Sequence, residues 1–166
     1  QIFISMTYAG PENESKTAIH DQFSTEIYDQ KLFNNSRGII MALPDGALTA
    51  SGSYNENHGP QNARLGASHI ENKSWAWCVS KNTDYLTIDM GTSHVVTGIE
   101  IASRGKDGHE KQMVTKFNVQ TSKNGIIWSD QGDYIGCYEP LVPVKRKLIR
   151  SVVASFVRIT PLEFVS

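Results

Sequence analysis

The five histidines and many serines could in principle support catalysis, but their spacing matches no catalytic motif. His58, His69, His94 and His109 are dispersed, none shows the His-x-x-x-His spacing of a helical metal pair, and His20 stands alone near the N-terminus. Neither a Gly-x-Ser-x-Gly elbow nor a phosphate-binding loop is present. Glycosidase carboxylate pairs form only in the fold, so the sequence leaves them open. We therefore expect a binding protein and not an enzyme.

Composition and charge narrow the class of ligand. The chain has 166 residues, 39% of them hydrophobic and 20% charged, which is enough apolar material for one packed domain. The formal net charge of -1 disfavours nucleic acid as a partner. No apolar run approaches the roughly 20 residues that cross a bilayer, and no signal peptide is visible. Sequons at Asn13, Asn34 and Asn72 favour a glycoprotein that is secreted or displayed at the cell surface.

Residues 1–45 differ from the rest of the chain in their pattern of apolar and polar residues. Ile2–Tyr8 is β-prone, residues 19–27 carry apolar side chains at four-residue intervals that favour a short helix, and Gly38–Leu43 has the apolar run of a short buried strand. This pattern predicts an N-terminal extension over residues 1–45, which could add a strand to a domain that occupies residues 46–166.

Short strands and turns dominate after residue 46. Tyr85–Met90 and Phe117–Thr121 alternate apolar and polar residues, as half-buried strands do. Asn124-Gly125 suits a type I′ hairpin turn, because both central residues of that turn need positive φ. The further predicted strands are Val95–Ile101, Leu148–Val153 and Phe156–Ile159. The pattern predicts an all-β sandwich or jelly roll.

A series of motifs occurs in a fixed order: Leu48–Tyr54, His58–Leu65, Trp75–Cys78, Tyr85–Gly91, Thr97–Gly105, Phe117–Trp128 and Ser155–Pro161. Their order and spacing resemble the discoidin domain family, the C-terminal domain type of coagulation factors V and VIII. The resemblance covers residues 47–166. It implies a jelly-roll β-sandwich of two antiparallel sheets with ligand-binding loops at one end. The family's last strand has no counterpart before Ser166. Either that strand is truncated or another strand fills the gap, and Ile2–Tyr8 is the candidate to cover the open edge.

The loop tips indicate the ligand class. In membrane-binding relatives the first loop carries bulky apolar residues, whereas here Asn55–Gly59 is polar, which disfavours membrane insertion. Polar tips suit a hydroxyl-rich ligand, and Arg104 falls where an arginine helps to hold galactose in the slime-mould lectins. The resemblance therefore implies a lectin-like adhesion module that binds a glycan or a cell-surface glycoprotein. The candidate ligand-binding residues are Tyr54, Asn57, His58, Trp75, Arg104, Asp107 and His109.

Two other ligand classes and several structural roles stay open. A protein partner or an anionic phospholipid is the alternative to a glycan, and the oligomeric state is not determined. Cys78 and Cys137 either stay free or form a disulfide, which would close a loop of about 60 residues and add about 4 kcal/mol in the chain-entropy model. A structural calcium ion is compatible with the family, although no acidic cluster demands it. We expect Trp77 and Trp128 to be core residues and Arg64–Asp89 to be an ion pair.

Overall fold

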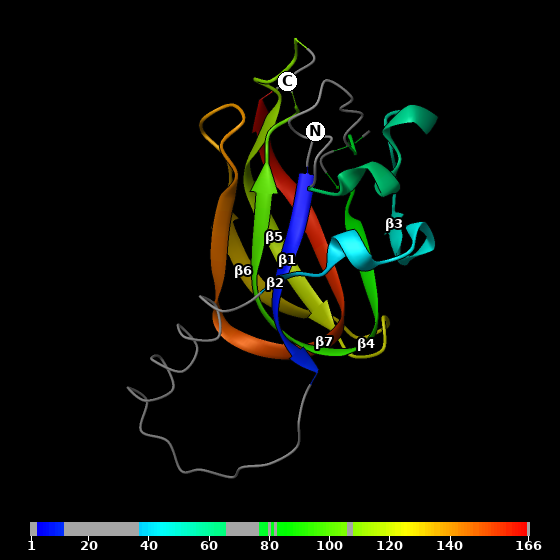
Figure 1. Cartoon of the computed structure of the whole chain (residues 1–166). Helices are drawn as coiled ribbons and strands as arrows, with labels where there is room; N and C mark the ends of the chain where they lie inside the picture. The colour runs from blue at the N-terminus through cyan, green and yellow to red at the C-terminus, as the bar shows by residue number, and fades with distance from the viewer. Residues whose placement is uncertain are drawn as a thin grey trace.

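The computed structural model describes residues 3–11, 37–65, 77–79, 81, 83–105 and 108–165. Antiparallel strands dominate this part of the chain (Figure 1). The strands are β1 Phe3–Pro11, β2 Arg37–Gly38, β3 Leu48–Ala50, β4 Leu86–Ala102, β5 Met113–Ser122, β6 Ser129–Ile135 and β7 Val144–Val165. Four short 3-10 helices accompany them: η1 Ile40–Ala42, η2 Asp45–Ala47, η3 Glu56–His58 and η4 Pro60–Ala63.

The strands form one antiparallel sheet in the order β2-β1-β4-β7-β5-β6, with β3 paired to β4. The first part of β4 pairs with the late part of β7 (Leu86 with Ile159), and its last part pairs with the start of β7 (Ile101 with Val144). Register shifts interrupt this pairing after Asp89 and again after Val96. Both strands curve through the lower end of the molecule in Figure 1. The sheet thus folds back on itself into two layers joined through β4 and β7, which confirms the jelly-roll β-sandwich.

The core lies between these two layers. Successive side chains of a strand point to opposite faces, so every second residue of Phe117–Thr121 is buried. Apolar side chains from both parts of β4 and β7 belong to the same core cluster as those of β5. Trp77 is completely buried, and its Nε1–H donates to the Gly52 carbonyl at 3.1 Å. Trp77 is therefore a core residue, as predicted, and its indole satisfies its one donor.

Three local predictions were wrong in detail. Gly38–Leu43 is not a strand: β2 ends at Gly38 and η1 follows, although Ile39 and Ile40 are buried. A short apolar run indicates that the segment is buried, but it does not distinguish a strand from a helix. The two strands expected at Tyr85–Met90 and Val95–Ile101 form the single strand β4, and β7 likewise absorbs two predicted strands.

The β5–β6 hairpin exists, but its turn is longer than a type I′ turn. Gly125 has a φ of 72°, whereas Asn124 is not among the residues with positive φ. The Asn124 side-chain oxygen instead accepts from the backbone N–H groups of Ile126 and Ile127, each at 3.0 Å. The Ser122 hydroxyl accepts from the Gly125 N–H at 2.9 Å. These side-chain bonds replace the backbone bonds of a two-residue turn.

The N-terminal strand β1 lies along the later part of β4, with Cα partners that run from Phe3–Ala102 to Pro11–His94. It also pairs with β2 at Thr7–Gly38. The predicted helix over residues 19–27 lies outside the described residues. No helix in the described part of the chain is long and apolar enough to cross a membrane.

Candidate ligand-binding loops

Two loops carry the described candidate residues: the first loop, residues 51–59, and the second loop, residues 103–112, of which 106 and 107 are not described. The first loop is fixed by hydrogen bonds to a buried segment. The Tyr54 N–H donates to the Cys78 carbonyl at 2.9 Å, and the Cys78 N–H donates to the His58 carbonyl at 3.4 Å. Because Trp77 anchors that segment in the core, the tip of the first loop has a defined position.

Asn55 organises the first loop. It precedes η3 as its N-cap, and its side-chain oxygen accepts from the Asn57 N–H at 3.0 Å. The same oxygen lies 2.7 Å from His58 Nδ1. An amide oxygen only accepts, so this assignment puts the proton of the neutral imidazole on Nδ1. Asn57 itself is exposed, and its carbonyl accepts from Asn62 Nδ2 at 2.9 Å.

His58 is the buried aromatic residue of the first loop, and Tyr54 is the exposed one. His58 is 7% exposed, and Tyr54 is 68% exposed. The two rings lie edge to face, with centroids 5.7 Å apart. Burial, and secondarily the positive charge of Arg104, lowers the pKa of His58 below 6.5. The neutral imidazole therefore persists to lower pH than in the unfolded chain, and the electrostatic effect of Arg104 reaches this side chain from the second loop.

The second loop is built around Arg104. Its Nη1 donates to Gln112 Oε1 at 3.0 Å, and its backbone N–H donates to the Gln112 carbonyl at the same distance. The Gln112 N–H in turn donates to the His109 carbonyl at 2.9 Å, which closes the tip. Arg104 is half-buried and His109 is exposed. The guanidinium is thus held in place while part of its surface stays open to solvent.

The structure links three of the predicted residues. The rings of Tyr54 and His58 are in contact, and the charge of Arg104 acts on His58. Trp75 and Asp107 lie outside the described residues, as do the three sequons. Sequence analysis missed two residues that hold the loops, Asn55 and Gln112. The signal for Asn55 was available, because Asn is a favoured N-cap. Gln112 had no comparable signal, since its partner is eight residues away.

Of the two alternatives for the cysteines the structure has the free thiols, and the predicted Arg64–Asp89 ion pair does not form. Cys78 and Cys137 are both free thiols. Cys137 is buried with its Sγ directed to the Ile101 carbonyl at 3.6 Å, whereas Cys78 Sγ is directed to the carbonyl of its own neighbour, Val79, at 3.7 Å. The two thiols therefore have different partners on different elements. Burial raises the pKa of the Cys137 thiol to about 11.

Arg64 pairs with a nearer carboxylate than the one predicted. Its Nη1 lies 2.7 Å from Asp45 Oδ1, and its Nη2 donates to the Leu43 carbonyl at 2.9 Å. The Asp89 carboxylate instead accepts from the Gly91 N–H at 2.8 Å, at the bend of β4. No group of three His, Cys, Asp or Glu side chains within the described ranges is placed to hold a metal ion.

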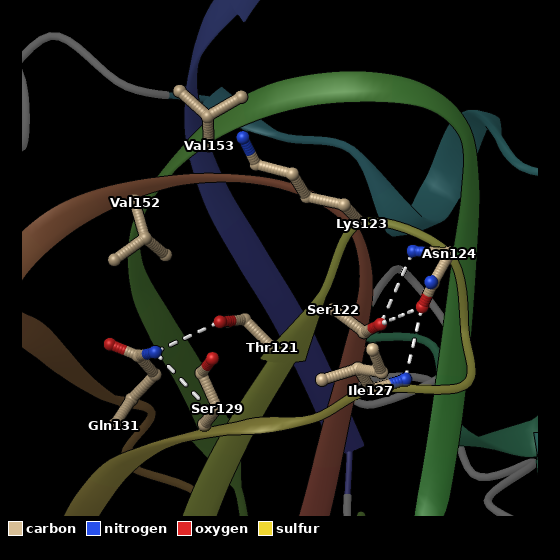
Figure 2. A pocket seen from close by; sticks show the side chains of 9 residues that line it. All are labelled: Thr121, Ser122, Lys123, Asn124, Ile127, Ser129, Gln131, Val152 and Val153. Atoms are coloured by element: carbon tan, nitrogen blue, oxygen red, sulfur yellow. Dashed lines mark hydrogen bonds between the residues drawn. The ribbon is translucent and has the colours of Figure 1, made fainter.

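A hollow of about 380 Å³ lies at the other end of β5 from the second loop. Figure 2 shows Gln131 directed toward Thr121 on one side of it, and Ser122, Asn124 and Ile127 joined by hydrogen bonds on the other. Most of its polar groups bond to one another, so it offers few groups to a ligand. Its lining residues are Thr121, Ser122, Lys123, Asn124, Ile127, Ser129, Gln131, Val152 and Val153.

The family model described as the F5/8 type C domain matches residues 47–165. Among curated proteins, chicken (Gallus gallus) neuropilin-1 is 35% identical over 97 residues, which are 55% of this chain and 10% of the relative. The rat (Rattus norvegicus) lactadherin is 29% identical over 133 residues, 74% of this chain and 31% of the relative. The Caenorhabditis elegans discoidin domain-containing receptor tyrosine kinase B is 28% identical over 72% of this chain and 16% of the relative. The chain thus spans less than a third of the length of these relatives.

Solved structures share the fold at low identity. Discoidin II of Dictyostelium discoideum has a TM-score of 0.60 at 17% identity, over 72% of this chain and 49% of that one. A family 32 carbohydrate-binding module of Clostridium perfringens NanJ, in complex with galactose, has a TM-score of 0.56 at 18% identity, over 74% of this chain and 88% of that one. The C. perfringens module CpGH89CBM32-5, in complex with GalNAc-β-1,3-galactose, has a TM-score of 0.58 at 19% identity, over 75% and 90%.

Proposed function

Because the chain belongs to the F5/8 type C (discoidin) domain family, whose domains are binding modules, we propose that it binds a glycan through its first and second loops. Discoidin domains occur in extracellular and cell-surface proteins, and an adhesive role at the cell surface is part of the proposal. The partner is a carbohydrate chain or a cell-surface glycoprotein that carries one.

The exposed Tyr54 ring supported by buried His58 is the observation that carries this proposal. A pyranose presents an apolar C–H face that packs on an aromatic ring, and its hydroxyls need donors and acceptors at the rim. Arg104, fixed by Gln112, supplies charged donors on the second loop, and its positive charge acts on His58, the residue in contact with that ring. Two structural neighbours were solved with galactose or a galactose-containing disaccharide, which supports testing galactosides first.

A glycan array tests the proposal directly. The wild-type chain should bind a defined set of glycans, and Tyr54→Ala should lose that binding while Tyr54→Phe keeps it, because the phenyl ring preserves the apolar platform. Ile126→Ala is the matched control, since Ile126 is 80% exposed but lies in the β5–β6 turn, away from the loops. Absence of binding to any glycan at high protein concentration would refute the proposal.

One observation favours a second candidate function, attachment to anionic phospholipid. Ile126 and Ile127 are 80% and 73% exposed at the tip of the β5–β6 turn, next to the exposed Lys123. Apolar side chains beside a basic residue suit a negatively charged bilayer surface. Sedimentation with phosphatidylserine liposomes separates the candidates: this function requires pelleting that Ile126→Ser with Ile127→Ser abolishes and that liposomes of phosphatidylcholine alone do not support.

A further inference from the structure

A second hollow, of about 290 Å³, opens on the outer face of the sheet and shares only Ser51 with the two loops. Arg158 of β7 is one of its lining residues and has Cα partners Thr87 on β4 and Gln120 on β5. Its side chain is on the outward side of β7, because the neighbouring Val157 and Ile159 are completely buried. The residues that line the hollow are Thr49, Ala50, Ser51, Tyr85, Thr87, Gly125, Trp128, Phe156 and Arg158.

Two aromatic rings hold the guanidinium of Arg158. Its Cζ lies 3.9 Å from the centroid of the Tyr85 ring and 3.9 Å from that of Trp128. Trp128 is thus a half-buried stacking partner, and its predicted role as a core residue was wrong. Stacking on two rings fixes the plane of the guanidinium and removes much of the freedom that an arginine side chain normally has.

The guanidinium has donors that the protein does not use. Arg158 Nε is buried without a hydrogen-bond partner, and no carboxylate in the described part of the chain forms an ion pair with this side chain. A buried donor without an acceptor costs about 1–3 kcal/mol, and more when it is charged. A planar guanidinium binds a carboxylate through two parallel N–H···O bonds, and an incoming carboxylate would pair with the two Nη groups, which are not among the buried atoms.

The walls of the hollow indicate what carries that carboxylate. Thr49, Ser51 and Thr87 carry hydroxyl groups and line the same hollow as Arg158, and Thr87 is its Cα partner on β4. The volume is at the lower end of the range of about 300–1,000 Å³ typical of small-molecule sites, which suits a single sugar ring. We propose that this hollow is a second binding site for an acidic sugar of the uronic-acid type, with its carboxylate on Arg158.

The site differs from the loop site in both residues and chemistry. Arg158 presents a cation between two rings on the side of the sandwich, whereas the loops present an exposed ring at its end. The hydroxyl groups of a neutral sugar can accept single hydrogen bonds, but they do not offer the two parallel, charge-assisted bonds that a carboxylate forms with a guanidinium. Discrimination between a uronic acid and its neutral analogue is therefore the property that defines this site, and it does not depend on whether the loops bind galactosides.

The experiment compares methyl β-glucuronide with methyl β-glucoside, which differ in one carboxylate, by NMR titration of the ¹⁵N-labelled chain. The glucuronide should shift the Trp128 indole N–H and the amides of Thr87 and Gln120, and the glucoside should not. Arg158→Lys should weaken glucuronide binding at least about tenfold, because an ammonium cannot form the bidentate pair. Arg150→Ala, which removes an exposed arginine of the same strand, should leave it unchanged.

Equal shifts with both sugars, or none with the glucuronide at millimolar concentration, would overturn the proposal even if Arg158→Lys fails to fold, since wild type alone gives that result. Succinate is the third ligand. If it binds as well as the glucuronide, the site binds any carboxylate and the assignment of an acidic sugar is wrong. If the galactosides of the loop site fail to bind while the glucuronide still shifts Trp128, only the proposed function is lost.

Discussion

The rings of Tyr54 and His58 lie edge to face, with centroids 5.7 Å apart and planes inclined at 84°. His58 is buried and Tyr54 is largely exposed, so a side chain fixed in the interior supports an aromatic ring at the surface. Asn55 holds the imidazole from its other side through Nδ1. The exposed Tyr54 ring is thus held in position before any ligand binds.

The buried imidazole should make stability depend on pH. The pKa of His58 in the folded chain is lowered below 6.5, chiefly by burial, so the unfolded chain binds more protons as pH falls through 6.5. The stabilisation by neutral His58 is complete above pH 6.5 and is lost as pH falls toward the folded pKa. Urea unfolding between pH 5 and 8 measures it: His58→Gln should flatten this slope, and the exposed His109→Gln should not. Equal slopes for wild type and His58→Gln would contradict the prediction.

Gly136 should tolerate no side chain. A Cβ built there would collide with the backbone oxygen of Val114, and the adjacent N–H groups of Gly136 and Cys137 bond to β5 carbonyls at 2.7 and 2.8 Å. Both strands would have to shift, so Gly136→Ala should destabilise by at least about 1–3 kcal/mol, the usual cost of overpacking. Gly46→Ala is the control, because no atom lies within 4 Å of its Cβ position. Similar midpoints for the two variants in chemical denaturation would contradict the close approach.

The two thiols should react at very different rates. Burial raises the pKa of Cys137 to about 11, so little thiolate exists at pH 8, whereas Cys78 is only half-buried. Iodoacetamide should modify one cysteine rapidly in the folded chain and both after denaturation, with peptide mapping assigning Cys78 as the fast site. An unreduced sample that resists modification even when unfolded would mean that the cysteines are bonded after all.

We propose that residues 1–45 and 46–166 fold as one unit, and β1 gives the test. A chain that lacks residues 1–11 leaves the His94–Ala102 part of β4 without its β1 partner. Unpaired strand edges promote association, so this chain should unfold at lower temperature and sediment partly as oligomers. A chain that lacks only residues 1 and 2 is the control. Unchanged unfolding of the shorter chain would show that β1 contributes little.

Alternation of apolar and polar residues predicted the strands and much of the core. Phe117, Val119 and Ile88 are buried as their spacing indicates, because a period of two is a local property of the chain. The continuity of β4 was not predictable in this way. The polar stretch around Gly91, whose φ is 74°, has the composition of a loop, and only pairing with β7 makes it a bend within a strand.

The candidate site likewise has features that the local sequence predicts and features that depend on the fold. The polarity of the first loop follows directly from its residues. The position of His58 depends on Cys78, about 20 positions later in the chain, whose N–H donates to the His58 carbonyl. Arg158 was not a candidate at all. Its significance comes from Tyr85 and Trp128, which lie on other segments and reach it only across the folded sheet.

The central claim is that a glycan binds at the first and second loops, and chemical-shift mapping during titration with methyl β-galactoside tests it most directly. Saturable shifts are expected at residues 54–58, 104 and 112, and Tyr54→Ala should abolish them while the remaining spectrum stays unchanged. Saturable binding whose shifts fall only elsewhere, or wild-type affinity in Tyr54→Ala, would contradict it.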